Sequence, residues 1–273
     1  MTNAQKHLEK AIQIQPEFAD AHYELALFFK DKGENEKARA HLLKVIEIQQ
    51  GIAKAHFHLA LLLKDMEDQK SSREHYQKAI DLDKDFADAH YHYGLLLADL
   101  EEYEEAKNNF EKTTDIDQNY SRAYFQLAKL LIDPEDYEKA KKNYLIAIDI
   151  DVSFADAHYY LGKLLSGGLK NDKDGTLVIK PEYDNAIIHY KKAIRINKNY
   201  AKAHYNLALV YKIQKNYDES RKHFERAIKI VNDYAKAHFH LAMLLKETCE
   251  LSSSKRSRPT PGVKKKTSIK SKN

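Results

Sequence analysis

Histidine is the side chain of this 273-residue chain with the most potential for metal binding or catalysis, and it occurs fourteen times. The histidines follow an internal repeat and do not cluster. Six share one repeat position: His22, His56, His90, His158, His204 and His238. Five share a second position: His7, His41, His75, His189 and His223. The other three follow a member of the first set by two residues: His58, His92 and His240. A residue that is copied along a repeat favours packing, so we predict a structural role.

The spacing of the histidines also argues against a metal site. Two residues along a helix turn the side chain by roughly 200°, so the rings of a His-x-His pair such as His56 and His58 diverge. A helical metal pair needs the i, i+4 spacing instead. Equivalent histidines of successive repeats should lie about 10 Å apart or more, whereas metal–nitrogen bonds are about 2 Å long. We therefore predict no metal and no cofactor.

The remaining candidates for chemistry are weak. With Gly175 as the sixth residue of a calcium loop, Asp172 and Asp174 fall at ligand positions, but the first and twelfth positions are Lys170 and Pro181, where carboxylates are required. We interpret the segment as a solvated loop, with a partner-contacting loop as the alternative. Cys249 is the single cysteine, so no internal disulfide can form. We predict no catalytic residues and no enzyme activity; an enzyme with an unrecognised site is the least favoured alternative.

A repeat of two helices accounts for most of the chain. The segment from Phe18 to Ala26 recurs from Ile52, Phe86, Tyr120, Phe154, Tyr200 and Tyr234, in steps of 34 residues and one of 46. The longer step contains a 12-residue insertion at about 167–179. In the second repeat the apolar residues fall at helical spacing, first in Ala55, Leu59, Leu62 and Leu63 and then in Ser72, Tyr76, Ala79 and Ile80. Each repeat is thus an antiparallel pair, helix A and helix B, that must stack on its neighbours.

Small and large residues alternate between the two helices. Helix A carries a small residue at Ala26, Ala60, Gly94, Ala128, Gly162, Ala208 and Ala242. Helix B carries a large one at Leu42, Tyr76, Phe110, Tyr144, Tyr190 and Phe224. This pattern resembles the tetratricopeptide repeat family, which implies an all-α solenoid, a right-handed superhelix whose helices A line the concave face. The chain departs from the family pattern in having His near the start of helix A and in keeping the repeat-end proline only at Pro16.

The expected organisation is an array over residues 1–250 and a tail over 251–273. The array comprises a partial helix B at 4–15, six full repeats from 18 to about 233 with the insertion at 167–179, and a terminal helix A at 234–249. Leu241, Leu244 and Leu245 then lack an obvious covering helix. We expect self-association, a partner or the tail to cover the ends, unless the sequence is truncated.

The family resemblance also places specific residues on the concave face, counting the small residue of helix A as the eighth position. The sixth-position residues, here called the ladder, are Glu24, His58, His92, Gln126, Tyr160, Asn206 and His240. The second position carries the charges Asp20, Lys54, Asp88, Arg122, Asp156, Lys202 and Lys236, and the ninth carries Lys129 and Lys163. The ladder is similar to the Asn ladder of the repeat region of O-linked N-acetylglucosamine transferases, whose repeats also read Ala-His-Tyr-x-Leu. We predict that it bonds an extended peptide.

The neighbouring positions leave alternatives open. The fifth position is always aromatic, which favours inter-helix packing over contact with a ligand. For the second position we favour ion pairs between neighbouring repeats over a groove of mixed charge that selects ligands. A clamp for a chaperone's terminal carboxylate, as in some family members, needs Lys or Asn at the fifth and ninth positions and is disfavoured, because these are aromatic and mostly Leu.

Charge and hydropathy complete the expectations. The tail holds eight basic and no acidic residues; removing these eight from 45 leaves 37 basic against 41 acidic residues in 1–250. Nucleic acid could therefore bind only through the tail, which we expect to be disordered. We expect no secretory signal or membrane span, and hence a cytoplasmic protein or, alternatively, a nuclear one. The predicted function is a non-catalytic scaffold that binds a peptide or protein; nucleic-acid association is the alternative.

Overall fold

The computed structural model describes residues 3–131, 134–167 and 180–256, which contain fourteen α-helices, one short 3-10 helix and no strand. The helices of type A are α2 (Ala19–Asp31), α4 (Ala53–Asp65), α6 (Ala87–Asp99), α8 (Ser121–Leu130), α10 (Ala155–Leu165), α12 (Ala201–Ile213) and α14 (Ala235–Arg256). Those of type B are α1 (Asn3–Ile14), α3 (Asn35–Ile48), α5 (Gln69–Leu82), α7 (Tyr103–Ile116), α9 (Tyr137–Ile150), α11 (Tyr183–Ile196) and α13 (Tyr217–Ile230). The predicted all-α class of stacked helix pairs is confirmed.

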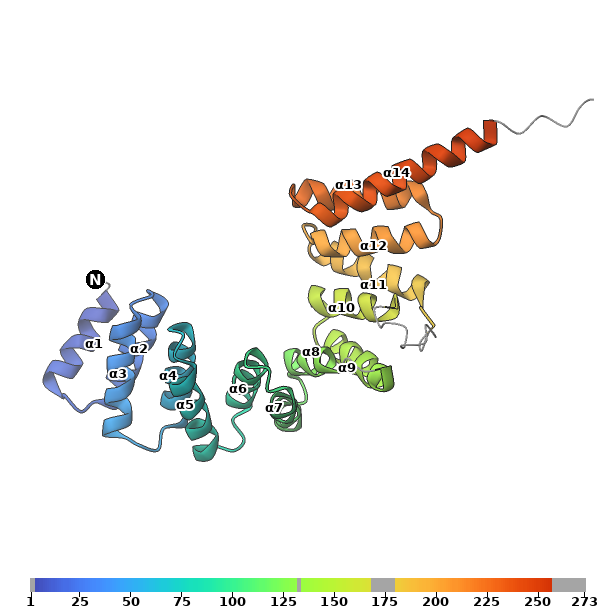
Figure 1. Ribbon diagram of the computed structural model, residues 1–273. Helices are drawn as coiled ribbons and strands as arrows, with labels where there is room; N and C mark the ends of the chain where they lie inside the picture. The colour runs from blue at the N-terminus through green and yellow to red at the C-terminus, as the bar shows by residue number, and fades with distance from the viewer. Residues whose placement is uncertain (1–2, 132–133, 168–179, 257–273) are drawn as a thin grey trace, which may run out of the picture. The chain divides into compact units, whose positions relative to one another are not determined.

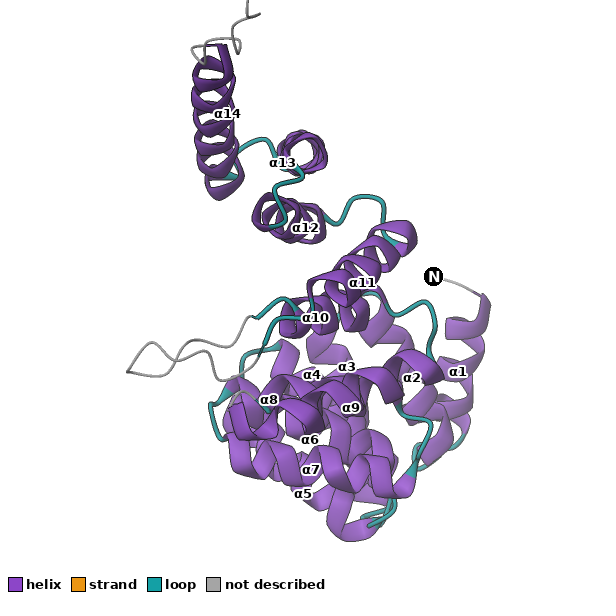
Figure 2. Ribbon diagram, turned by 90° about the vertical axis from the view of Figure 1, so that its right-hand side faces the viewer, coloured by secondary structure: helices purple, strands orange, loops and turns teal. Residues whose placement is uncertain are grey.

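The chain divides into two compact units, residues 1–152 with α1 to α9 and residues 153–273 with α10 to α14. Within each unit every helix packs against the next one in the chain (Figures 1 and 2). The strongest pairing is between helices A and B of the same repeat, and the weaker one joins a helix B to the following helix A. Neighbouring repeats therefore bury the faces that one helix pair leaves open.

The turn between helices A and B requires a left-handed residue. Gly33 adopts φ +72°, and residues at the same repeat position, Glu67, Glu101 and Lys215, adopt φ between 61° and 64°. The backbone N–H of Glu34 then donates to the carbonyl of Phe29, which satisfies an otherwise unpaired group at the end of the helix. Because this turn spans only a few residues, the two helices must run antiparallel.

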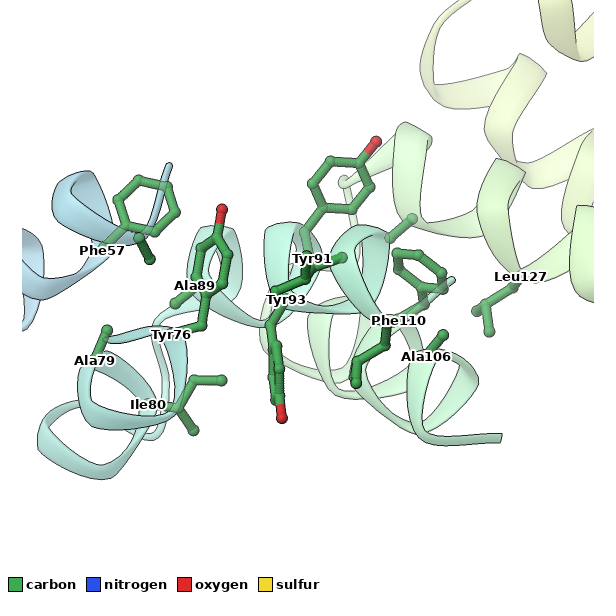
Figure 3. Close-up of a cluster of buried hydrophobic side chains, with 14 residues drawn as sticks. Phe57, Tyr76, Ala79, Ile80, Ala89, Tyr91, Tyr93, Ala106, Phe110 and Leu127 are labelled. Atoms are coloured by element: carbon green, nitrogen blue, oxygen red, sulfur yellow. The ribbon is translucent and has the colours of Figure 1, made fainter. Parts of the chain in front are cut away.

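The core of each repeat is a large residue of helix B set against the small residue of helix A. Phe110 of α7 is fully buried, and a Cβ atom added at Gly94 of α6 would lie 2.8 Å from its ring. Figure 3 shows how the neighbouring aromatics fit around this contact, with Tyr91 and Tyr93 on opposite sides of α6. Tyr93 stacks on the buried Tyr76 of α5 with 6.0 Å between ring centroids. The small position thus permits the close approach that the repeat needs.

Two of the small residues that open helix B are serines, and both are buried with their hydroxyls satisfied. Ser72 donates to the carbonyl of Ala60 at 2.8 Å, and Ser220 donates to the carbonyl of Ala208 at 2.8 Å. A buried hydroxyl without a partner would destabilise the repeat, so these bonds explain why serine is tolerated beside alanine at this position.

The last helix is longer than the sequence analysis expected. We placed the end of the terminal helix A at residue 249 and a tail from 251, whereas α14 continues to Arg256. No glycine or proline occurs between Ala235 and Arg258, so nothing in the sequence stops the helix after one repeat length. Residues 168–179 of the predicted insertion at 167–179, which include Asp172, Asp174 and Gly175 of the calcium-like segment, and residues 257–273 lie outside the described residues.

None of the described helices has the length and apolar character that a bilayer crossing requires.

Candidate functional site

Histidines of the first set form partly buried pairs between helices A and B of their repeats, here together called the histidine seam. In four repeats the Nδ1 atoms of two histidines lie within hydrogen-bond distance: His22–His41 at 2.9 Å, His56–His75 at 2.9 Å, His158–His189 at 3.0 Å and His204–His223 at 2.8 Å. The helix A members are all buried. These histidines therefore have the packing contacts within their repeats that a structural role requires.

The hydrogen bonds fix the tautomers of a seam pair. Nε2 of His22 lies 3.0 Å from the carbonyl of Pro16, which only accepts, so this nitrogen carries the proton. Nδ1 of a neutral His22 must then accept the proton of His41 Nδ1. Burial and then the neighbouring His22 lower the pKa of His41, and burial lowers the pKa of His189 to about 4. His41 and His189 are thus uncharged near neutral pH.

One repeat uses an amide in place of the second histidine. His90 Nδ1 lies 3.0 Å from Asn109 Oδ1, at the position where the other pairs have their helix B histidine. Among the side chains that the structure describes, no three His, Cys, Asp or Glu residues come together as metal ligands would.

Within each unit, several ladder residues contact the fifth-position aromatic of the repeat before them. In the first unit His58 packs edge-on against Tyr23, at 5.6 Å, and His92 against Phe57, at 5.6 Å. In the second unit Asn206 donates to the hydroxyl of Tyr159 at 3.0 Å. The ladder side chains are half-buried, except for Glu24, which is exposed.

Four of the fifth-position aromatics have the packing role that we favoured: Phe57, Tyr91, Phe125 and Tyr159 are buried. Tyr23 and Tyr205 are half-buried, and Phe239 is exposed. The aromatic residue that precedes the next helix A stacks on the buried rings: Phe86 lies 5.0 Å from Phe57, and Tyr200 lies 4.9 Å from Tyr159. We did not predict this second aromatic layer, although the repeat motif begins with an aromatic residue in all but one copy.

His58 is the ladder residue with an unmet hydrogen-bonding group. Its Nδ1 is buried and has no partner, although the ring is half-buried overall. Burial, followed by the charges of Lys30 and Lys54, lowers the pKa of His58 to about 4. Burial also lowers the pKa of His92. Both rings are therefore neutral near pH 7, so each carries one donor and one acceptor nitrogen.

The ion pairs that we predicted along the second position are absent from the part of the chain that the structure describes. Asp88 instead accepts a hydrogen bond from the hydroxyl of Tyr120 at 2.8 Å, and Asp156 accepts one from Tyr200. At Asp88 and Asp156 the prediction was wrong because the tyrosine that opens the next repeat reaches the carboxylate. Lys54 and Arg122 stay exposed, so the mixed-charge surface remains the better interpretation.

The two ninth-position lysines lie beside ladder residues of their own helices. Lys129 donates to Gln126 at 3.1 Å and stands 5.6 Å from the centre of the Phe125 ring. Lys163 stands 6.0 Å from the centre of the Tyr160 ring. Both lysines are exposed and carry positive charge close to the ladder.

Comparison with known families explains this architecture. Models of the tetratricopeptide repeat match residues 1–61, 87–120, 121–151 and 201–234, and a model described as TPR repeat matches residues 63–101 and 177–214. The chain belongs to the tetratricopeptide repeat (TPR) family. The matches show the TPR family but not the closer resemblance to O-linked N-acetylglucosamine transferases, which stays a prediction.

Solved TPR structures share the fold at low sequence identity. PilF of Pseudomonas aeruginosa is 21% identical, with 82% of this chain and 97% of that chain covered and a TM-score of 0.69. YrrB, described as a TPR protein with an unusual peptide-binding site, is 23% identical, with 73% and 96% covered and a TM-score of 0.57. The Cut9–Hcn1 assembly of the APC/C is 16% identical, with 88% and 46% covered and a TM-score of 0.65. No curated protein matches the chain.

Proposed function

We propose that this TPR chain is a non-catalytic interaction scaffold that binds an extended peptide or protein segment along the ladder. The observation that carries the proposal is the unpartnered Nδ1 of His58, half-way along the ladder of the first unit. A buried polar atom without a partner costs free energy, roughly 1–3 kcal/mol, and a ligand group would recover this cost by pairing with Nδ1 after the ring turns toward the surface. A peptide backbone supplies donors and acceptors at intervals suited to such a line of polar side chains.

The chemistry around His58 supports a backbone ligand more than a single charged group. His58 and His92 are neutral near pH 7 and Gln126 is an amide, so each is able to pair with an N–H or a carbonyl. Exposed charges of both signs, Lys54, Asp88 and Arg122, flank them and would select the charge pattern of the ligand side chains. Tyr160, Asn206 and His240 would serve the same role on the second unit.

The relatives add a limited argument. YrrB is described as having a peptide-binding site and Cut9–Hcn1 is an assembly of two proteins. Their identity to this chain is too low to carry a partner or a site over, so the ladder assignment depends on the contacts of this chain alone.

Affinity purification with a triple ladder variant tests the proposal. We expect His58→Ala/His92→Ala/Gln126→Ala to lose partners that the wild-type chain retains from a cell extract, with mass spectrometry as the readout. The matched control is Glu74→Ala/Asn108→Ala/Lys142→Ala, which changes three exposed residues at one repeat position of helix B in the same unit. An identical set of partners for the ladder variant and the wild type would show that the ladder is not the binding surface.

Nucleic-acid association through residues 251–273 remains the second candidate, on the strength of the eight basic side chains of that segment. Phosphate contacts would give binding that weakens steeply with salt. Deletion of residues 257–273 should abolish such binding, and salt-independent binding would argue against it. The cytoplasmic or nuclear location likewise stays a prediction.

A further inference from the structure

The last helix presents a face that every other helix of type A buries. On α14, Phe239 is 61% exposed and Leu245 is 42% exposed, whereas the equivalent Phe57 and Leu63 of α4 are 7% and 3% exposed. His238 and Ala242 are exposed as well, and their counterparts on α4 are buried. The opposite side of α14 packs normally on α13 through Ala237 and Leu244. Among the residues that the structure describes, none supplies the helix B that would complete this repeat.

The first helix has the reciprocal defect. α1 is a helix B, and its Ala4 and His7 are exposed while Leu8 and Ala11 are only half-buried. The equivalent small and large residues of α3 are fully buried: Ala38, Leu42 and Val45. In those repeats the covering surface is the preceding helix A, and no described residue takes that place beside α1.

The two open faces match each other position by position. A complete repeat joins a helix A histidine to a helix B histidine and sets a small residue of helix A against a large one of helix B. α14 offers His238 and Ala242 at the helix A positions, and α1 offers His7 and Leu8 at the helix B positions. We propose that α14 of one molecule packs against α1 of a second copy of this chain, so that two half-repeats form one complete repeat.

His238 of α14 makes the same backbone hydrogen bond as histidines of complete repeats. His238 Nε2 lies 2.9 Å from the carbonyl of Asn232, and His22 Nε2 lies 3.0 Å from that of Pro16, so Nε2 carries a proton in both and Nδ1 is the acceptor in the corresponding tautomer. His7 would donate from its Nδ1, as His41 does to His22. The same contact buries Phe239 and Leu245, which supplies the hydrophobic driving force.

The length of α14 fits an intermolecular repeat. α14 has 22 residues, whereas the covered helix α4 ends after 13 residues and turns into its own helix B. In Figure 1, α14 runs on past the end of α13. When the covering helix belongs to another molecule, no turn is needed and the helix is free to continue. The contact joins two different faces, so it propagates head to tail into open chains or closes into rings.

Complementary end variants test this proposal without relying on the ladder. Ala4→Arg blocks the α1 face and Ala242→Arg blocks the α14 face; both positions are exposed and helical, so circular dichroism should show an unchanged fold. In sedimentation velocity we expect the wild type to form species larger than dimers as concentration rises, and each variant alone to stay monomeric. An equimolar mixture should form a one-to-one dimer, because one intact face of each kind remains. Gln13→Arg, at an exposed position of α1 whose counterpart Glu47 is solvent-facing, should associate like the wild type.

The histidine contact gives a second readout. His7→Ala should weaken association about two- to tenfold, whereas His7→Asn should retain most of it, because Asn109 occupies this position opposite His90. A wild-type chain that stays monomeric at its highest soluble concentration would overturn the proposal. So would self-association of Ala4→Arg alone, which would show that two α14 faces pair, or association that appears only after deletion of residues 257–273.

Discussion

Helix α4 and the first part of helix α14 have almost the same sequence, but α4 is packed on both faces and α14 on one. Residues 53–64 and 235–246 differ only where Leu61 of α4 is replaced by Met243 in α14. On α4 both faces of the helix are packed, and Phe57 and Leu63 belong to the core. On α14 only the face toward α13 is packed, and Phe239 is largely exposed.

The difference shows that burial in a solenoid is a property of neighbours rather than of the residue. Each helix of type A needs one helix B from its own repeat and one from the repeat before it. α14 has the second and lacks the first. A side chain that contributes to the core in one copy of the repeat is therefore available for docking in another.

The largest expected effect on stability comes from removing the aromatic ring that is buried on α4 and exposed on α14. Phe57→Ala should lower the free energy of unfolding by about 3–5 kcal/mol, because it leaves a cavity beside Tyr76 and Phe86. Phe239→Ala should change it by less than about 0.5 kcal/mol, because the ring is mostly in water already. Both are measured by denaturant unfolding in the Ala4→Arg background, where the α14 face stays uncovered. Equal losses would mean that Phe239 is buried in the isolated chain.

The second prediction concerns how the seam makes stability depend on pH. α4 forms a seam pair with α5, whereas among the described residues α14 has no such pair. Burial lowers the pKa of His56 and of His75 below the ~6.5 of an unfolded chain. The unfolded state therefore binds protons first as the pH falls, and stability that is present above pH ~6.5 is lost below it. The slope for each group stays under about 1.4 kcal/mol per pH unit, because each histidine binds at most one proton.

Exchanging the two kinds of seam partner sharpens this prediction. His75→Asn copies the His90–Asn109 pair and should make the loss of stability between pH 7 and 4 shallower. Asn109→His creates a histidine pair and should make the loss steeper. Unfolding curves collected across this pH range report both slopes, and parallel curves for the three proteins would show that the seam does not control acid stability.

The third effect is smaller and concerns the tyrosine that opens a repeat. Tyr120 donates to Asp88, the second-position residue of the repeat before it. Tyr234 is its counterpart before α14, and there the second-position residue of the preceding repeat is Lys202, which cannot accept a hydrogen bond. Tyr120→Phe should cost about 0.5–1.5 kcal/mol, and Tyr234→Phe, which keeps the stacking on Tyr205, should cost less. Thermal unfolding of the two variants makes the comparison, and an equal cost would assign the effect to stacking alone.

The smallest expected effect on stability concerns an exposed ion pair to a neighbouring helix A, which both α4 and α14 form. Lys64 of α4 pairs with Asp99 at 2.7 Å, and Glu247 of α14 pairs with Lys212 at 3.4 Å. Lys64→Gln and Lys212→Gln should each cost less than about 1 kcal/mol, because such pairs are exposed and screened by salt. A loss of several kcal/mol for either variant, seen in denaturant unfolding, would mean that outer charges rather than the core hold the repeats together.

The packing at the repeat positions was predictable because it depends on the size of the residue at each position. A glycine at 94 and a phenylalanine at 110 specify a close approach whatever the rest of the chain does. The charges of the second position were not predictable in the same way. Asp88 has both Arg122 and Tyr120 within reach in the next repeat, and only the geometry of the turn decides that the hydroxyl reaches it first.

The sequence by itself determined the period, the helix pairs and the small-against-large packing, because these follow from side-chain volumes that recur every 34 residues. Only the tertiary structure decided which histidines pair across the seam, that Nδ1 of His58 has no partner, and that α14 is uncovered on one side. The physical reason is that exposure and hydrogen bonding depend on which neighbour is present at each face. Helices α4 and α14, which are nearly identical in sequence, acquire different roles for that reason.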